Sequence, residues 1–251
     1  EDGIRDRDVT GVQTCALPIS IPLNTLLTED QWRYMIEDSR AAAVVVSADL
    51  LERVGPLVDD IARRRKLHVI VSGDGAATRP SLAGLMSSSA ADAQAADTSA
   101  DEVAFWLYSS GSTGMPKGTR HVHASPMHTA KLFAGEVLNV TKDDVFFSAA
   151  KLFFAYGLGN AMSFPMSVGA AAVLLPDRPT PDSVMAVMRA HNPTVFCGVP
   201  TLLASMLAHK EIGKGAGSNR LRLTISAGEA LPEEIGLRWQ AKVGTEVIDG
   251  I

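Results

Sequence analysis

Side chains that could bind phosphate concentrate in one stretch of eleven residues, from Tyr108 to Gly118. The stretch holds three glycines, four serine or threonine hydroxyls and one lysine. Glycines allow successive backbone N–H groups to turn toward one point, where they bind anions. Lys117 adds a mobile positive charge that suits phosphate. Because the apolar run 103–108 precedes it and predicts a strand, we expect the loop at a sheet's carboxyl edge, where open α/β folds bind ligands.

The spacing around Lys117 separates this loop from the ordinary P-loop. That motif has glycine immediately before the lysine and serine or threonine immediately after it. Here Pro116 precedes Lys117 and Gly118 follows it, which disfavours a Walker-type NTPase. A ligand-free Ser/Gly turn is the remaining alternative, but such turns rarely carry Pro-Lys-Gly directly behind a strand.

An aromatic segment, residues 151–160, is the second feature that could select a ligand. Flat aromatic walls suit a flat aromatic acid through stacking and apolar contact. The alternative is that the aromatics are core residues, which explains Phe153 or Phe154 readily. It explains Tyr156 less well, because Gly157 beside it leaves room next to the ring.

Three histidines, His121, His123 and His128, follow the phosphate-binding loop. No cysteine or carboxylate completes a metal site with them at a familiar spacing. We therefore predict no metal site within the chain, and expect these histidines to lie near the phosphates or at the surface.

The elements that must position these residues alternate between strand and helix. Strands are predicted at 43–47, 67–72, 103–108, 145–148, 170–175, 194–197, 221–226 and 246–248. Helices are predicted after Thr28, near 50–61, at 125–138, 157–167, 201–209 and 233–242, and from Thr180-Pro181-Asp182 onward. This alternation indicates an α/β fold of mostly parallel sheets flanked by helices. Gly55-Pro56 should kink or interrupt the second helix.

Composition excludes several classes of partner. The net charge of −5 with no basic stripe argues against nucleic-acid binding. The most apolar region, 157–176, is interrupted by polar residues and fails the criterion for a membrane span. The acidic N-terminus does not resemble a signal peptide. Two cysteines cannot form a disulfide framework, so we expect a reduced, cytoplasmic setting. Oligomeric state is left open.

Two regions stand outside this pattern. Residues 1–19 are densely charged, and 9–19 resemble the conceptual translation of a DNA-sequencing adapter, so we interpret 1–19 as a non-native scar. A genuine N-terminal arm is the alternative. Residues 73–100 are rich in Ser, Ala and Asp and predict a surface linker with one helical turn near 82–86.

The segment Ser109–Gly118 resembles the phosphate-binding signature of the acyl-adenylate-forming (AMP-binding) superfamily, and the resemblance extends over 20–251. In that family the loop clamps the ATP phosphates while a carboxylate attacks the α-phosphorus. By this resemblance phosphate contacts would come from Ser109, Ser110, Gly111, Ser112, Thr113, Gly114 and Lys117. Thr113 and Lys117 would be the catalytic residues among them.

Two further segments extend the resemblance. Residues 226–232 are similar to the family's adenine-binding turn, so Gly228, Glu229 and Ala230 would line the base together with Asp249. An ordinary strand–helix turn is the alternative for this segment taken alone. Residues 151–160 and 21–28 resemble benzoate– and hydroxybenzoate–CoA ligases, which implies that Ala155, Tyr156 and Gly157 contact the acid.

The resemblance implies an acid–thiol ligase that activates a benzoate-like acid with ATP and passes it to coenzyme A, with Mg²⁺ as the metal. It also implies that 20–251 is an incomplete N-terminal domain, without the C-terminal domain and the Mg²⁺-binding glutamate, and has little activity alone. A non-catalytic nucleotide-binding module and an enzyme that adenylates an acid for a carrier protein are the alternatives. The ring substituent is not specified by these residues.

Overall fold

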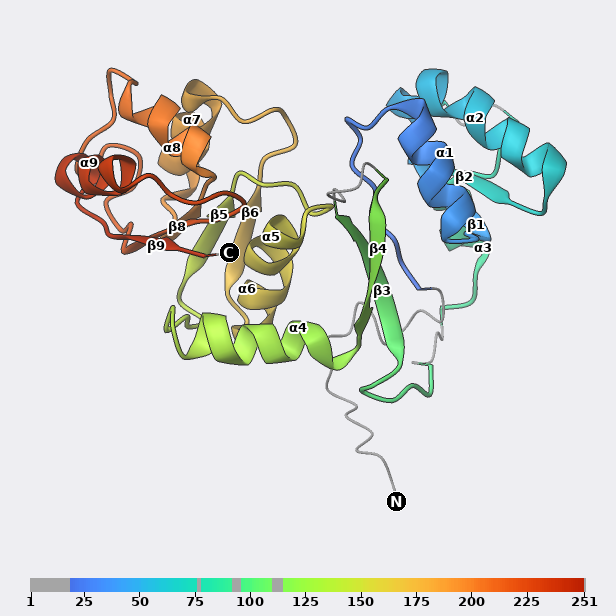
Figure 1. Ribbon diagram of the computed structural model, residues 1–251, viewed down its shortest axis with the longest axis horizontal. Helices are drawn as coiled ribbons and strands as arrows, with labels where there is room; N and C mark the ends of the chain where they lie inside the picture. Colours follow the sequence, from blue (N-terminus) through green and yellow to red (C-terminus); the bar gives the residue numbers. More distant parts are fainter. Residues whose placement is uncertain (1–18, 76–77, 92–95, 110–114, 251) are drawn as a thin grey trace. The chain divides into compact units, whose positions relative to one another are not determined.

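The computed structural model describes residues 19–75, 78–91, 96–109 and 115–250 (Figure 1). The chain divides into two compact units. The small unit contains residues 19–97 and Phe105–Arg120, and the large unit contains Thr98–Ala104 and the chain from His121 onward.

A five-stranded parallel sheet forms the centre of the large unit. Its strands are β5 (Val145–Ser148), β6 (Ala171–Leu174), β7 (Val195–Cys197), β8 (Leu223–Ser226) and β9 (Val247–Asp249). They lie in the order β6-β5-β7-β8-β9, and every pair is parallel. The chain passes from β5 to β6 on one side and then returns to place β7 on the other side of β5. Such a reversal of strand order marks where open α/β sheets bind ligands.

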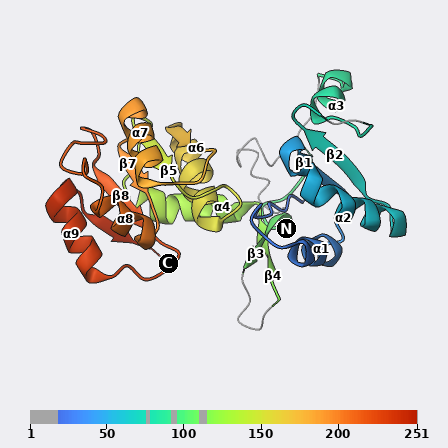
Figure 2. The ribbon, with the colours of Figure 1, turned by 90° about the horizontal axis from the view of Figure 1, so that it is seen from above.

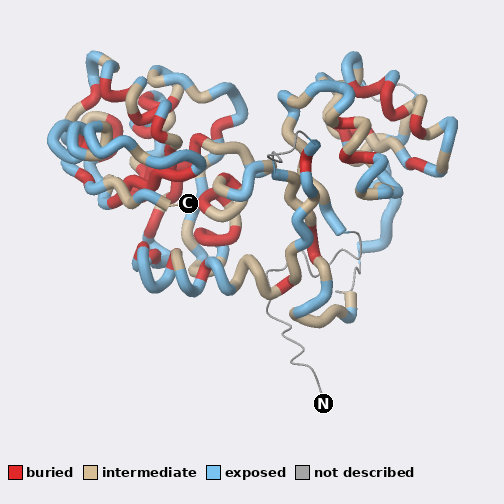
Figure 3. The backbone as a smooth tube through the Cα atoms, viewed as in Figure 1, coloured by how far each residue is buried: buried red, intermediate tan, exposed pale blue. Residues whose placement is uncertain are grey.

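Helices cover both faces of this sheet, as Figures 1 and 2 show. One face packs against α7 (Pro181–His191), α8 (Pro200–Leu207) and α9 (Glu233–Val243), with Phe147, Phe196 and Trp239 at its centre. The other face packs against the helical segments 124–135 and 155–168 through Phe146, Cys197 and Ile225. Successive strand residues point to opposite faces, so β7 and β8, which are buried along their whole length, face helices on both sides (Figure 3).

The helical segments of the second face are not uniformly α-helical. The first consists of α4 (Ala124–Thr129) and a π-helical part, Ala130–Gly135. The second consists of α5 (Ala155–Leu158), a π-helical part, Gly159–Ser163, and α6 (Phe164–Val168). Both lie where helices were predicted.

Side-chain caps begin the helices at the predicted threonines. Thr28 caps α1 (Glu29–Asp38) through a capping box with Gln31. Thr180 does the same for α7 with Ser183, and Pro181 occupies the first turn. Both predicted starts are confirmed.

The small unit contains a two-stranded parallel sheet of β1 (Ala43–Ser47) and β2 (His68–Ser72). A short 3₁₀ segment, Ala48–Leu50, leads into α2 (Leu51–Arg64). Helices α1 and α2 pack on this sheet through a cluster that includes Trp32, Ile36, Val58 and Ile61. The stretch predicted as a linker contains α3 (Leu82–Ser88), longer than the single turn expected.

Of the kink or interruption predicted at Gly55-Pro56, the interruption is wrong, because α2 continues through Pro56. Pro56 removes one backbone hydrogen bond near the start of the helix. Gly55 has no Cβ to meet the proline ring, which relieves the usual clash with the preceding residue. Burial of Leu57, Val58 and Ile61 against β1 and β2 then holds the helix together.

The strand β4 (Lys117–Val122) was not predicted. It pairs with the predicted strand β3 (Val103–Ser109) in a two-stranded sheet. The His123 N–H donates to the Glu102 carbonyl at 3.0 Å, so the end of β4 lies beside the start of β3. The two strands therefore run in opposite directions and bracket the predicted phosphate-binding loop. None of the helices in the described ranges is long and apolar enough to cross a lipid bilayer.

A buried ionic network joins the amino ends of β5, β7 and β8. Arg222 donates to both carboxylate oxygens of Asp144, at 2.9 and 2.8 Å, and Thr194 Oγ1 donates to the same carboxylate at 2.6 Å. Burial alone would raise the pKa of Asp144, but hydrogen bonds from Arg222, Thr194 and the Thr141 N–H, with the charge of Arg222, lower it to about 2. Asp144 is therefore ionised at neutral pH.

We expect Asp144→Asn to lower the free energy of unfolding by roughly 2–3 kcal/mol, measured by urea denaturation. This loss of stability is smaller than the loss expected on breaking a fully buried ion pair, because the Arg222 side chain is 38% exposed. Since the folded pKa is about 2 and the ordinary value 3.8, the stabilisation is present above about pH 4 and is lost toward pH 2. The difference from the native chain should shrink over that window. Asp143→Asn, an exposed neighbour, is the control, and an equal loss from it would contradict this account.

Candidate functional site

The carboxyl edge of the five-stranded sheet gathers three of the predicted site segments. Strand β5 leads through residues 149–154 into α5, which contains Ala155, Tyr156 and Gly157. Strand β8 leads into the turn 227–232, and β9 ends at Asp249. Parallel strands leave the sheet at the same edge, so these segments emerge on one side of the large unit (Figure 1).

The turn after β8 has a conformation that favours glycine. Gly228 has φ +95°, and a side chain in this left-handed region is strained. The space around it is open, because the atom nearest to an added Cβ is Val199 Cγ1 at 3.9 Å. Glu229 and Ala230 follow and are exposed. The backbone here is therefore accessible to a flat ligand.

Asp249 lies against the same turn. Its carboxylate accepts the Leu231 N–H at 3.2 Å, and the Gly250 N–H donates to the Ser226 carbonyl at 2.7 Å. The structure thus brings Asp249 together with the turn that carries Gly228. That these residues bind adenine stays a prediction.

Tyr156 presents its ring rather than its hydroxyl. The hydroxyl donates to the Ile225 carbonyl of β8 at 2.8 Å, and the ring packs beside the cluster that contains Cys197. Burial, with the nearby Cys197 thiol, raises the pKa of Tyr156 well above its ordinary value. Cys197 is itself fully buried, and burial raises its pKa. Ala155 beside Tyr156 is exposed.

Gly157 is required by the local backbone. A Cβ at this position would lie 2.0 Å from the Lys151 carbonyl oxygen, so the close approach of backbone excludes any side chain. That the glycine also leaves room beside the Tyr156 ring stays a prediction. The alternative that Phe154 is a core residue fails, because Phe154 is 47% exposed; its ring lies against Phe153 in a tilted arrangement, with ring centroids 4.7 Å apart.

The predicted phosphate-binding loop belongs to the small unit. Ser109 ends β3 and Lys117 begins β4, and both side chains are exposed. The central residues lie outside the described ranges: Ser110, Gly111, Ser112, Thr113 and Gly114. No carboxylate in the described ranges forms an ion pair with Lys117. The hairpin therefore presents the lysine with its charge available to an anion.

Tyr108 anchors this hairpin within the small unit. Its hydroxyl donates to the Asp38 carboxylate at 2.6 Å, at the end of α1. Burial, together with that hydrogen bond, raises the pKa of Tyr108. The strand that leads into the loop is thereby attached to a helix rather than free to shift.

The histidines after the loop do not form a metal site in the structure. Within the described ranges, no three His, Cys, Asp or Glu side chains are grouped so as to hold an ion. His123 is buried, while His128 is exposed. Burial lowers the pKa of His121.

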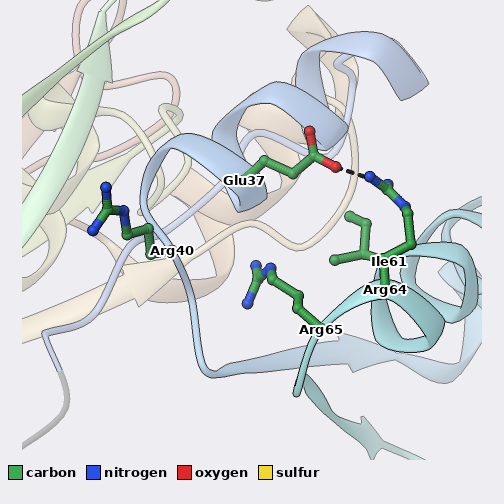
Figure 4. A pocket seen from close by; sticks show the side chains of 5 residues that line it. All are labelled: Glu37, Arg40, Ile61, Arg64 and Arg65. Carbon is green, nitrogen blue, oxygen red and sulfur yellow. Dashed lines mark hydrogen bonds and ion pairs between the residues drawn. The ribbon is translucent and has the colours of Figure 1, made fainter.

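A cavity of about 490 Å³ lies in the small unit between α1 and α2 (Figure 4). Glu37, Arg40, Ile61, Arg64 and Arg65 line it, and none of these is a predicted site residue. Arg64 pairs with Glu37 at 2.8 Å, and Arg65 donates to the carbonyls of Ala41 and Ile36 at 2.6 and 3.0 Å. Because these two guanidinium groups already have partners, the cavity is a weak candidate for an anion site.

No role was assigned to Lys151 from the sequence. In the structure, this residue joins the segments that follow β5 and β6 at the carboxyl edge of the sheet. Its ammonium donates to the carbonyls of Leu175, Pro176 and Asp177 after β6. A lysine directly behind a buried strand and ahead of an aromatic segment is the signal that could have identified it.

Known proteins with similar sequences share this arrangement of segments. The family model described as AMP-binding enzyme matches residues 18–251. The benzoate–CoA ligase of Thauera aromatica is 50% identical over 233 residues, and the 4-hydroxybenzoate–CoA/benzoate–CoA ligase of Rhodopseudomonas palustris is 46% identical over 233 residues. Each alignment covers 93% of this chain and 43% of the relative, so the chain spans less than half the length of these proteins.

A solved structure agrees with these matches. The crystal structure of a benzoate CoA ligase from Burkholderia xenovorans LB400 superimposes with a TM-score of 0.83 at 45% identity, covering 93% of this chain and 45% of that chain. The parallel sheet flanked by helices thus corresponds to the N-terminal domain of adenylate-forming enzymes. The chain belongs to the AMP-binding enzyme family.

Proposed function

We propose that residues 20–251 provide the ATP-binding and acid-binding segments of a ligase that converts a benzoate-like acid to its acyl-adenylate and then to its coenzyme A thioester. The observation that carries the proposal is the 50% identity with the Thauera aromatica benzoate–CoA ligase over 233 residues. The activity is proposed for a polypeptide of the relatives' length that contains this segment.

The loop from Ser109 to Gly118 is assigned to the β- and γ-phosphates of ATP. Backbone N–H groups and the hydroxyls of Ser109, Ser110, Ser112 and Thr113 would donate to phosphate oxygens. Lys117, exposed at the start of β4, would neutralise charge on the leaving pyrophosphate. The rate gain would come from positioning and from electrostatic stabilisation that is organised before reaction.

Mg²⁺ is proposed to enter with ATP and to supply charge neutralisation at the phosphates. Mg²⁺ commonly binds through phosphate oxygens and one or two carboxylates, and keeps several waters. The described residues of this chain include exposed lysine and serine side chains that can donate to phosphate, and they contain no cluster of metal ligands. An ion that is bound through the phosphates of the nucleotide fits this set of residues. The residues named above would hold the nucleotide, and through it the ion.

The turn after β8 is assigned to adenine. Its open backbone at Gly228 and its exposed residues Glu229 and Ala230 support close approach of a flat base. Asp249 accepts the Leu231 N–H and so holds the turn in this conformation.

Ala155 and Tyr156 are assigned to the acid. Because the Tyr156 hydroxyl is already bonded to the Ile225 carbonyl, the ring is what remains for the substrate. This arrangement favours a flat aromatic acid through apolar contact and does not itself select a hydroxyl or amino substituent.

The activity is tested by joining residues 20–251 to the remaining segment of the Thauera aromatica ligase. We expect this chimera to form benzoyl-CoA, AMP and pyrophosphate only when benzoate, ATP and coenzyme A are all present. The 251-residue chain alone should show little or no turnover. Adenylate formation without thioester would instead favour an enzyme that serves a carrier protein, and ATP binding without turnover in the chimera would favour a binding module.

Removing the charge at Lys117 tests the phosphate assignment. Lys117→Ala in the chimera should lower ATP affinity about 10- to 100-fold, because a hydrogen bond to a charged group contributes roughly 1.5–3 kcal/mol. Calorimetric titration with ATP and the KM for ATP provide the measurements. Lys131→Ala, at an exposed lysine in the π-helical segment, is the control. Unchanged ATP affinity in the Lys117 variant would remove the assignment.

Two substitutions at Tyr156 separate the ring from the hydroxyl. Tyr156→Phe keeps the ring, so the KM for benzoate should change less than about threefold, although the lost hydrogen bond should lower stability by about 1 kcal/mol. Tyr156→Ala removes the apolar wall and should raise that KM about tenfold or more. If Tyr156→Phe alone raised the KM for benzoate as much as Tyr156→Ala, the hydroxyl rather than the ring would contact the acid.

A further inference from the structure

Lys151 reaches from the exit of β5 to the exit of β6 in the large unit. Its ammonium donates to three successive backbone carbonyls: Leu175, Pro176 at 3.0 Å and Asp177 at 2.6 Å. Lysine has three N–H donors and no acceptor. Each donor therefore has an acceptor, and the side chain is fully used in joining the two strand exits.

The backbone carbonyl of Lys151 makes a second set of contacts, with the segment that begins α5. Its carbonyl accepts the Phe154 N–H at 3.0 Å and lies so close to Gly157 that an added Cβ would be 2.0 Å from it. The Leu158 N–H then donates to the Phe154 carbonyl at 2.8 Å and continues the first turn of α5. The position of Lys151 thus sets the start of the helix that carries Ala155 and Tyr156.

A direct contact between Lys151 and the acid is the competing interpretation. A carboxylate would need at least one free ammonium proton, and the three carbonyls occupy all three. Burial lowers the pKa of Lys151, while the Asp177 carboxylate opposes that change. Recruiting the ammonium to substrate would therefore break contacts that hold the edge of the sheet.

We propose that Lys151 is a positioning residue for the acid-binding segment: its ammonium ties the β5 exit to the β6 exit, and its carbonyl fixes the first turn of α5. The inference rests on the proposed function for the role of Ala155 and Tyr156. The structural part of the proposal, that Lys151 ties the two strand exits and fixes the first turn of α5, concerns this chain alone. It can be tested without measuring catalysis.

The first experiment is amide hydrogen exchange on the 251-residue chain. Lys151→Met keeps an apolar stem of similar length and removes all three donors. The Phe154 and Leu158 amides should lose protection, while the amides of β5 should keep theirs. Lys142→Met, at an exposed lysine ahead of the amino end of β5, is the matched control and should change neither. Unchanged exchange at Phe154 and Leu158 in the Lys151 variant would overturn the proposal.

The second experiment measures kinetics in the chimera whose unmodified form makes benzoyl-CoA. Lys151→Met should lower kcat/KM for benzoate about 10- to 100-fold, mainly through a higher KM for benzoate, since small displacements of a binding segment have effects of that size. The KM for ATP should change less than about twofold. Lys151→Arg keeps several donors on a cationic side chain and should restore most of the activity.

The outcomes of the two experiments distinguish the proposal from a general loss of stability. If Lys151→Met lowered the melting temperature and kcat while both KM values stayed unchanged, Lys151 would be structural only. The same conclusion would follow if neither Lys151 variant folded. An inactive unmodified chimera would instead reject the proposed function. The hydrogen-exchange experiment would still test whether Lys151 joins the exits of β5 and β6.

Discussion

Parallel pairing of β5 to β9 is the constraint on which the large unit depends, because every strand must then leave the sheet at the same edge. Segments distant in sequence, such as 149–157 and 227–232, therefore emerge at the same edge of the sheet. Strand pairing alone brings them to this edge, and no direct contact between them is needed. The reversal of strand order beside β5 separates the exits of β6 and β7 and leaves room between the crossovers. Binding residues can therefore vary in these exits while the buried strands stay unchanged.

The two edges of this sheet differ in how their polar groups are satisfied. At the amino edge, the Asp144 carboxylate is bonded by Arg222, Thr194 and the Thr141 N–H. Near the carboxyl edge, the buried Ser226 hydroxyl and the Asn160 amide oxygen have no hydrogen-bond partner in the part of the chain that the structure describes. Buried polar groups rarely lack partners unless a site has a role beyond folding. The acid-binding and adenine-binding segments proposed above leave the sheet at the edge where these two groups lie.

Sequence patterns predicted the elements whose causes are local. Thr28 and Thr180 begin helices through bonds made within four residues, and the valine-rich run 43–47 forms a strand, in which only Val46 is buried. Causes that depend on distant neighbours were not predictable. The polar strand Lys117–Val122 forms because β3 offers it a partner, and Gly157 is a glycine because the Lys151 carbonyl approaches it. The loop from Ser110 to Gly114 remains a prediction from sequence.

Tyr156 has a structural role that is compatible with the role proposed for it in binding the acid. Its hydroxyl is bonded to the same Ile225 carbonyl that accepts the Gly198 N–H at 3.0 Å, so it joins α5 to the exits of β7 and β8. With its polar end occupied, the ring is held in a fixed orientation and can offer only an apolar surface. Lys151 holds the start of the same helix through the carbonyls after β6. The proposed acid-binding segment is therefore fixed by contacts that a substrate does not need to break, and a segment fixed in this way loses little conformational entropy when a flat ligand binds.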